Sequence, residues 1–301
     1  MIHVKALSID KQFKEITLHS KKPLIVHSVF ERVINILIED KLFTLVSNQI
    51  DNAPATLIVD YPDFNECGID ADAHGFLTSK RIEITGCLSI DLTTTPTWIC
   101  QLTEFPAHEK TLENNISIAM QEIVSTGNVK WLQKKESNLT DFDKEMGRML
   151  KERTIKLVEG FPKNDTNQNV QNAKQLIGLG QGLTPSGDDF LVGLLLAFSI
   201  IKKNVFCKKT WGEQVVKEAK NNTNIISYTT LKYAAIGQTR EIIQLFIDTL
   251  VSGKEDEQVK QTLSNVIKIG SSSGTEIAWG ILNGLTLLLK QEEQNDNTSK
   301  H

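Results

Sequence analysis

The sequence predicts an α+β protein, with an N-terminal antiparallel β barrel or sandwich followed by a C-terminal all-helical domain. Short runs rich in β-branched residues recur up to about residue 105, and turn residues separate them. Beyond that point the apolar residues recur at helical spacing instead. We therefore expect a β-rich domain over 1–105 and a helical domain over 106–292, followed by a polar, disordered tail over 293–301.

The predicted strands are short apolar runs, and no helical period lasts long enough in this part of the chain to compete with them. They cover residues 2–7, 15–18, 24–30, 33–38, 42–46, 56–59, 81–84 and 88–92. The segment 61–80 contains Pro62, Gly68 and Gly75, so it is predicted to be a long loop. In the second domain, apolar spacing and capping residues predict helices over about 187–203, 211–221, 226–237, 239–252, 256–268 and 274–290.

Composition excludes several classes of function. The chain has 301 residues with 40% hydrophobic content, a formal net charge of -4 and a pI near 5.9, so it offers no basic field for nucleic acid. The cysteines have no C-x-x-C spacing and are interpreted as reduced thiols of a cytoplasmic protein. The longest apolar run, 190–201, is too short to span a bilayer, and we expect no membrane partner, no metal and no cofactor.

The most informative stretch is GLGQGLTPSGDDFLVG, residues 178–193. Pro185 forces Thr184 into an extended conformation, and Ser186 then stands where a helix N-cap belongs, with Asp189 as the capping-box acid. A glycine-rich turn before an exposed helix N-terminus suits a small anion, because unpaired amides and the helix dipole both favour negative charge. A buried helix with a good cap, whose glycines only permit tight packing, is the structural alternative.

Two familiar phosphate motifs do not fit this stretch. Residues 182–187 have the G-x-x-x-x-G spacing of a phosphate loop, but Asp188 and Asp189 replace the lysine and hydroxyl residue that would hold phosphate and magnesium. The glycines are also spaced wrongly for a dinucleotide fingerprint, and no clean strand precedes them.

A second stretch, GSSSGTEIAWGILNG at 270–284, has the same pattern. Each stretch has Ser-Gly, a polar residue, an acid, and a glycine four residues beyond that acid. Glycines inside apolar helices permit close backbone contact, so Gly193, Gly280 and Gly284 predict two central helices that cross tightly. We hypothesise that the two helix N-termini converge on one anion; a coincidence of two common caps is the alternative.

The adjacent acids restrict the chemistry. Neighbouring helical positions point about 100° apart, so Asp188 and Asp189 are not expected to face the same ligand. No histidine occurs between His108 and His301. A mechanism in the helical domain would therefore use carboxyls and oriented donors, not a histidine relay.

These motifs, with the helix start near Ser227, resemble a prokaryotic family long described as of unknown function, in which some members were labelled carboxylases. That family has been connected with the AllH-type subunit of oxamate carbamoyltransferase in anaerobic allantoin breakdown. The resemblance is specific over 178–193 and fair over 225–285, and over the β-rich part it extends only to the general layout. It implies carbamoyl exchange between carbamoyl phosphate and oxamate, giving oxalurate and phosphate, in an assembly with partner subunits.

Both lines of reasoning favour a site that binds small planar anions through amides and hydroxyls. The candidate catalytic residues are Asp188 and Asp189. The candidate substrate-binding residues are Gly180, Gly182, Thr184, Ser186, Gly187, Ser227, Ser272, Ser273 and Gly274. The alternatives left open are a noncatalytic anion-binding or scaffold subunit and a carboxylase-like enzyme of unknown substrate.

Overall fold

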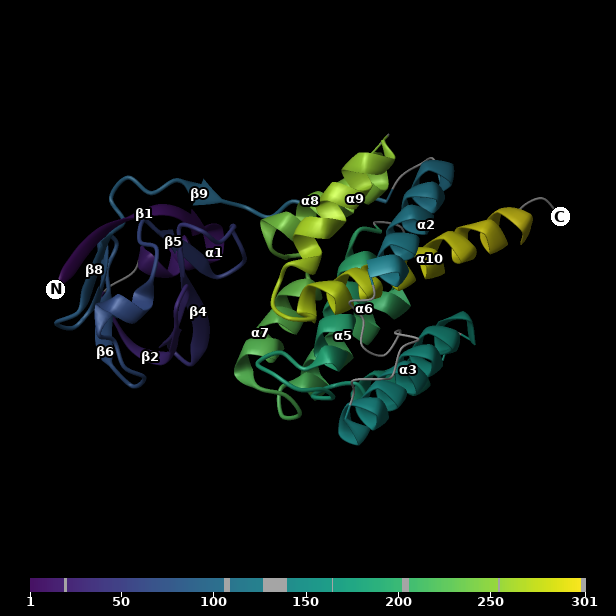
Figure 1. Ribbon diagram of the computed structural model, residues 1–301, viewed down its shortest axis with the longest axis horizontal. Coiled ribbons are helices and arrows are strands. Elements are labelled where there is room, and N and C mark those ends of the chain that lie inside the picture. Colours follow the sequence, from purple (N-terminus) through teal and green to yellow (C-terminus); the bar gives the residue numbers. More distant parts are fainter. Residues whose placement is uncertain are drawn as a thin grey trace. The chain divides into compact units, whose positions relative to one another are not determined.

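The structure is a computed structural model that describes residues 1–18, 21–105, 109–126, 140–163, 165–201, 206–253 and 255–298. The chain divides into two compact units, Met1–Cys100 and Gln101–His301 (Figure 1). The end of the predicted tail, residues 299–301, lies outside the described residues.

The first unit is a closed β barrel, which confirms the predicted N-terminal barrel (Figure 1). Around the ring the strands follow the order β5, β4, β3, β2, β6, β7, β8 and β1, and β1 pairs with β5 to close it. Most of these neighbours are antiparallel as predicted, but β4 with β5 and β1 with β8 are parallel. The strands are β1 Ile2–Asp10, β2 Lys22–Phe30, β3 Val33–Ile38, β4 Lys41–Ser47, β5 Thr56–Val59, β6 His74–Leu77, β7 Arg81–Ile84 and β8 Leu88–Asp91, with β9 Thr97–Trp98 added beside β1.

One predicted strand is a helix. Residues 15–18 were expected to be extended, but helix α1 occupies Lys11–Thr17. The buried Asp10 carboxylate caps this helix by accepting hydrogen bonds from the amides of Gln12 and Phe13 at 3.0 and 3.2 Å. Phe13 and Thr17, one helical turn apart, are both buried, so the cap and the buried face outweigh the local β preference.

The predicted loop over 61–80 also contains regular structure. A short 3-10 helix, Phe64–Cys67, is followed by strand β6, which pairs with β2 and β7. Gly75 lies in that strand with its Cα directly against the carbonyl oxygen of Glu83, where a Cβ would overlap it. This glycine therefore permits a close strand approach, whereas the sequence pattern indicated a turn.

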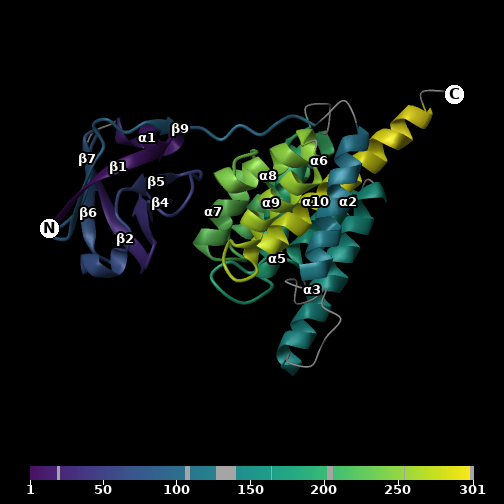
Figure 2. The same cartoon turned by 45° about the horizontal axis from the view of Figure 1, so that its top comes forward.

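The second unit is helical, as predicted (Figure 2). Its helices are α2 Glu109–Thr126, α3 Asp141–Gly160, α4 Thr166–Lys174, α5 Ser186–Ser199, α6 Phe206–Ala219, α7 Ile225–Ala234, α8 Glu241–Ser252, α9 Asp256–Ile267 and α10 Ser273–Thr298. Each of the six helices predicted after residue 186 overlaps one of α5 to α10. In the part of the chain that the structure describes, no helix is long and apolar enough to cross a membrane.

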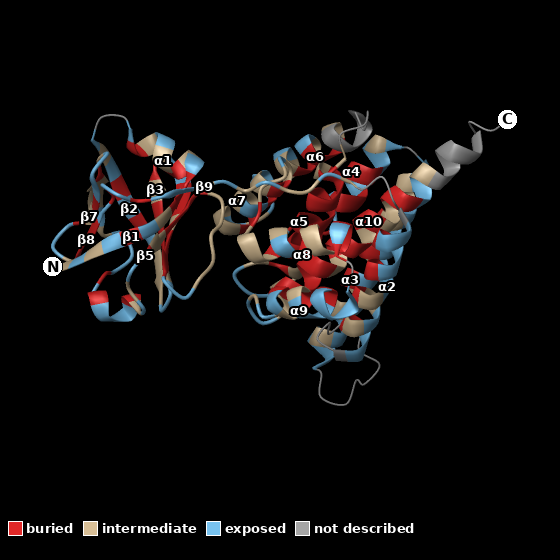
Figure 3. Cartoon of the chain, turned by 90° about the horizontal axis from the view of Figure 1, so that it is seen from above, coloured by how far each residue is buried: buried red, intermediate tan, exposed pale blue. Residues whose placement is uncertain are grey.

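Helices α5 and α10 form the centre of this unit. Figure 3 shows the buried residues concentrated on them, and every residue of α5 from Gly187 to Phe198 is buried. The two helices cross at glycines, because a Cβ on Gly193 would lie 2.9 Å from the Cα of Gly280, and one on Gly280 would lie 3.0 Å from the Cα of Gly193. The predicted tight crossing is confirmed, and it fixes the two helix N-termini relative to each other.

Candidate functional site

The first helix start differs in one detail from the prediction. Pro185, not Ser186, is the N-cap of α5; its carbonyl oxygen accepts from the amides of Asp188 and Asp189 at 2.9 and 3.1 Å, and no side chain caps the helix. The prediction of Ser186 as N-cap was wrong, because the extended backbone required around proline places the helical turn one residue earlier. Asp189 is therefore not used as a capping-box acid, and its carboxyl faces other groups.

Asp188 holds the glycine-rich turn against the helix. Its Oδ1 accepts from the amide of Gly178 at 2.9 Å, and its Oδ2 accepts from the hydroxyl of Thr223, just before α7. The Ser227 hydroxyl lies close enough to lower the pKa of Asp188, although its buried oxygen forms no hydrogen bond of normal geometry with a described residue. Burial outweighs these donors, so the pKa of Asp188 is raised.

Asp189 points to the other helix. Its carboxyl accepts from the hydroxyl of Thr184 at 3.1 Å and also pairs with the hydroxyl of Ser273, the first residue of α10. Burial, and to a lesser extent the nearby Glu276, raises the pKa of Asp189 to about 8, against the lowering effect of the two hydroxyls. The carboxyl therefore carries a proton at neutral pH. As expected from helical geometry, the two adjacent acids face different partners.

The two helix starts meet through hydroxyl groups. Thr184 Oγ1 and Ser273 Oγ lie 2.9 Å apart and are hydrogen-bonded, although 89 residues separate them along the chain. The hypothesis that the two N-termini converge is thereby confirmed. The small anion that they were expected to share remains a prediction.

The N-terminus of α10 has the same backbone hydrogen bonds as the N-terminus of α5. The amide of Gly187 donates to the carbonyl of Leu179 at 2.8 Å, and the amide of Gly274 donates to the carbonyl of Ile269 at 3.0 Å. Each of these two glycines also lies so close to a preceding carbonyl that a Cβ would overlap it. The resemblance between the two sequence stretches thus reflects an internal structural repeat, which the coincidence of two caps would not produce.

These backbone bonds change which groups are available to a ligand. At both starts the amides of the second to fourth helical residues already donate to protein carbonyls. The groups that face each other across the crossing are instead hydroxyls and carboxyls: Thr184, Asp189 and Ser273, with Ser272 Oγ 3.5 Å from Glu276 Oε2. The arrangement suits a ligand with both amide donors and acceptor oxygens more than a bare anion.

The glycines of the loop take two positions. Gly180, with φ +131°, has its Cα so close to the amide of Ser186 that a Cβ would lie 2.4 Å from that nitrogen. Gly182, with φ +95°, has open space where a Cβ would stand. Both need a backbone conformation that favours glycine. Gly180 therefore packs against the helix start, whereas Gly182 lies on the open side of the loop.

Three residues at this site were missing from the sequence-based candidates. Glu276 is buried and raises the pKa of Asp189, and the hydroxyl of Thr223 donates a hydrogen bond to Asp188. The buried Thr275 hydroxyl has no hydrogen-bond partner among the described residues. Glu276 could have been found, since it occupies the position of Asp189 in the second stretch. Thr223 had no signal in the sequence, because only the tertiary fold brings the residues before α7 to the start of α5.

Over the described ranges, no group of three or more histidine, cysteine or acidic residues has the geometry to hold a metal ion.

The chain is a two-domain protein, with a closed β barrel followed by a helical unit. In the helical unit, two helices with similar N-terminal segments bring their polar residues together in one site. Comparison with known families gives this class a name. Residues 176–285 match the family described as oxamate carbamoyltransferase subunit AllH, and residues 5–97 match the AllH family N-terminal domain. The chain belongs to the AllH family. No solved structure matched the chain.

Proposed function

We propose that the chain is a subunit of a carbamoyltransferase that acts on oxamate or oxalurate and carbamoyl phosphate in allantoin breakdown. The family description supports the transferase and its association with other subunits. The observation that supports a site in this chain is the hydrogen bond between Thr184 and Ser273, which brings two repeated sets of hydroxyl and carboxyl groups together. The same place contains Asp189, whose pKa is raised to about 8 by burial.

In the proposed reaction the amide nitrogen of oxamate attacks the carbamoyl carbon, and the bond from that carbon to the phosphate oxygen breaks. The nitrogen loses one proton as it forms the new bond. Asp189 is assigned to take this proton, and to return it to the departing nitrogen when oxalurate is cleaved by phosphate. A carboxyl that is protonated at neutral pH suits the cleavage direction, because it supplies the proton that the leaving oxamate needs.

Asp188 has a different proposed role. It binds the amide of Gly178 and the hydroxyl of Thr223, so it positions the glycine-rich loop that carries Thr184. Thr184, Ser273 and Ser272 would then orient the carboxylate and amide groups of the substrate. The roles of the loop glycines and of Ser227 remain predictions.

The charge of the site favours a shared catalytic centre. In the described part of the chain, no lysine or arginine is among the groups that shift the pKa of Asp188 or Asp189. A dianionic phosphate needs cationic or amide donors, whereas this site offers carboxyls and hydroxyls. We therefore assign the amide-bearing end of the substrate to this chain and the phosphate contacts to a partner subunit.

The test is phosphorolysis of oxalurate by the purified chain, alone and with the other subunits. Asp189→Asn keeps the shape and hydrogen-bonding capacity of the side chain but cannot transfer a proton, so we expect kcat to fall by about 10²-fold or more with little change in KM. Glu213→Gln, an exposed position on α6, is the matched control and should behave as wild type. Full activity of both Asp188→Asn and Asp189→Asn in the complex would refute the assignment.

The second candidate function is a noncatalytic anion-binding or scaffold subunit. One observation favours this function: the backbone amides at both helix N-termini already donate to protein carbonyls. Fewer hydrogen-bond donors are therefore left to stabilise a transition state. In that case Asp189→Asn would weaken assembly or oxamate binding in calorimetric titration while the assembled complex kept its kcat. Bicarbonate-dependent carboxylation of another substrate, with no activity on oxamate or oxalurate, would instead indicate the carboxylase-like alternative.

A further inference from the structure

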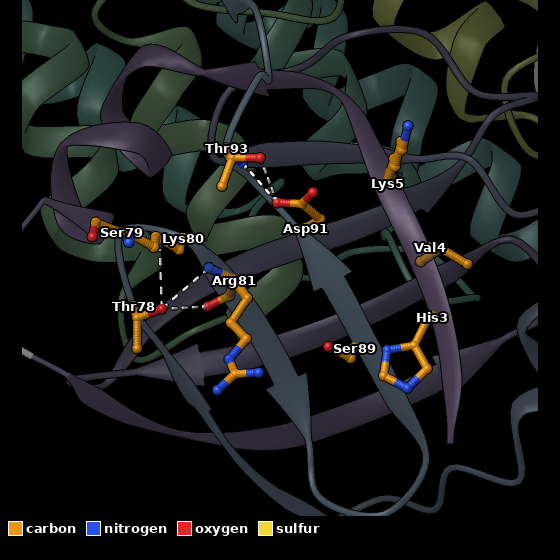
Figure 4. Close-up of a pocket in the computed structure, with 10 residues that line it drawn as sticks. All are labelled: His3, Val4, Lys5, Thr78, Ser79, Lys80, Arg81, Ser89, Asp91 and Thr93. Atoms are coloured by element: carbon orange, nitrogen blue, oxygen red, sulfur yellow. Dashed lines mark hydrogen bonds between the residues drawn. The ribbon is translucent and has the colours of Figure 1, made fainter.

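A second polar site lies on the outer face of the barrel, within the first unit. Strands β1, β7 and β8 and the turn before β7 surround a hollow of about 730 Å³ (Figure 4). Ligand sites for small organic molecules commonly have volumes of about 300 to 1,000 Å³. The hollow is therefore large enough to take a molecule of metabolite size.

Strand register places the chemical groups of this hollow on one face. Lys5 on β1 lies beside Asp91 on β8, and His3 lies beside Ser89 two pairs further along. Arg81 on β7 is paired with Asp91 from the other side. Since alternate residues of a strand point to opposite faces, the intervening Ile82 and Ile90 are fully buried in the barrel. Figure 4 draws the polar side chains over these adjacent strands.

Positive charge predominates in the lining. Lys5 on β1 and the consecutive Lys80 and Arg81 at the start of β7 bring three cations to the hollow, and Asp91 is the one acid among its described lining residues. Lys80 makes no ion pair with any residue that the structure describes. Arg81 has an acid, Glu83, at 4.0 Å from its Nε, and its guanidinium carbon lies 6.0 Å from the centre of the Phe76 ring, so no close ion pair with a described residue engages its terminal nitrogens.

The acid in the lining is already held by the protein. Asp91 Oδ1 accepts from the amide and the hydroxyl of Thr93 at 2.9 and 2.8 Å. These donors, and the nearby Lys5, lower the pKa of Asp91. One carboxylate oxygen is thus occupied, and the other is available to accept a hydrogen bond from a hydroxyl or amino group.

The turn that carries two of the cations is fixed before any ligand binds. Thr78 Oγ1 accepts from the amides of Lys80 and Arg81 at 3.3 and 3.1 Å and donates to the carbonyl of Arg81 at 3.1 Å. This hydrogen-bonded turn fixes the backbone from which the Lys80 and Arg81 side chains extend. Preorganised groups of this kind lose less conformational entropy on binding than side chains on a mobile loop.

We propose that this face of the barrel binds a small organic phosphate with at least two negative charges and a neighbouring hydroxyl or amino group. The planar guanidinium of Arg81 can donate two parallel hydrogen bonds to a phosphate, and Lys5 and Lys80 supply further positive charges around the hollow. The free oxygen of Asp91 and the hydroxyl of Ser89 then contact the polar part of the ligand. The site lies entirely in the barrel and uses none of the residues assigned to carbamoyl transfer.

The probes are ATP, ribose 5-phosphate and inorganic pyrophosphate, titrated calorimetrically into the full chain at constant ionic strength. Arg81→Gln and Lys80→Ala each remove one cation from the hollow, and together they should weaken binding at least tenfold. Asp91→Asn removes the opposing charge and should tighten the binding of pyrophosphate. The matched control is Lys41→Ala, which removes an exposed cation from β4, outside the hollow.

The outcomes separate the proposal from general charge attraction. Tight binding that is lost in the double variant but kept in Lys41→Ala supports the site, and stronger binding of ribose 5-phosphate or ATP than of pyrophosphate assigns a role to the hydroxyl-bearing part. No binding of any probe at millimolar concentration would overturn the proposal. An equal loss of binding in Lys41→Ala would also overturn it, because the effect would then belong to surface charge alone. Unchanged thermal unfolding of each variant, followed by circular dichroism, checks that the barrel is intact.

Discussion

Replacing Gly193 by alanine adds one methyl group where α5 and α10 cross. The new Cβ would overlap the carbonyl oxygen of Ile277 and lie 2.7 Å from the amide nitrogen of Ile281 and 2.9 Å from the Cα of Gly280. All three neighbours are backbone atoms of α10, so no side-chain rotation relieves the overlap. The helices must separate by several tenths of an ångström or more along a buried interface.

The expected magnitude follows from two opposing effects. Overpacking a well-filled core costs about 1 to 3 kcal/mol and more when the backbone must move, so we take ~3 kcal/mol here. Alanine is better than glycine inside a helix by ~1 kcal/mol, which offsets part of this cost. The net loss of about 2 kcal/mol should lower the Tm of the helical unit by roughly 4 to 8 °C.

The assay is thermal unfolding followed by circular dichroism at the helical signal. Gly212→Ala is the matched control, since Gly212 is also a buried helical glycine but its Cβ would meet the side-chain atom Leu195 Cδ2 at 3.1 Å, which can move. That variant should unfold at or slightly above the wild-type temperature. If Gly193→Ala also unfolds at or above the wild-type temperature, α5 and α10 do not cross at these glycines and the reasoning is refuted.

Further predictions concern charge and capping. Folding raises the pKa of Asp189 from 3.8 to about 8, so the folded state binds the carboxyl proton more tightly than the unfolded state does. The resulting contribution to the unfolding free energy is complete below about pH 4 and is lost as the pH rises towards 8. The unfolding free energy of the wild type should therefore fall between pH 5 and 8, and in Asp189→Asn this fall should be smaller by up to about 1.4 kcal/mol per pH unit. Denaturant titrations at several pH values measure the difference. An unchanged pH profile would contradict the raised pKa of Asp189. Asp10→Ala should destabilise the barrel by about 2 to 3 kcal/mol, because Asp10 Oδ2 caps α1 and also accepts from the buried amide of Ala55 at 3.0 Å. Asp63→Ala, which removes an exposed cap of one amide, is the control and should cost less than about 1 kcal/mol; equal losses in urea unfolding would count against the buried role of Asp10.

The candidate site was partly visible in the sequence. Ser-Gly followed by a polar residue and an acid, with a glycine four residues later, identified both helix starts and their crossing at Gly193 and Gly280. The same pattern contained Glu276, but its expected role as a capping residue obscured its electrostatic effect on Asp189. The prediction of Ser186 as N-cap failed because a side-chain cap and a proline cap have almost the same local sequence, and only backbone geometry separates them.

The barrel shows the same limit in another form. Alternation and turn residues predicted most strands, since these signals act over a few residues. They missed β6, because the glycine that indicated a turn is required by the close approach of β7, and they misplaced residues 15–18, where a buried cap on Asp10 favours α1. The parallel contact of β1 with β8 joins strands far apart in the chain, so no local pattern encodes it. The strands β4 and β5 are consecutive, but alternation within each strand does not tell that they pair in parallel.

Local sequence determined the order of strands and helices, the two glycine-marked helix starts and the family to which the chain belongs, because propensity, capping and motif spacing are short-range properties. Tertiary structure alone decided which groups meet. It buried Asp189 beside Glu276, joined Thr184 to Ser273, engaged the helix-start amides with backbone carbonyls, and collected Lys5, Lys80 and Arg81 on one face of the barrel. Desolvation and the approach of residues distant in the chain produce these properties, and both arise only when the chain is packed.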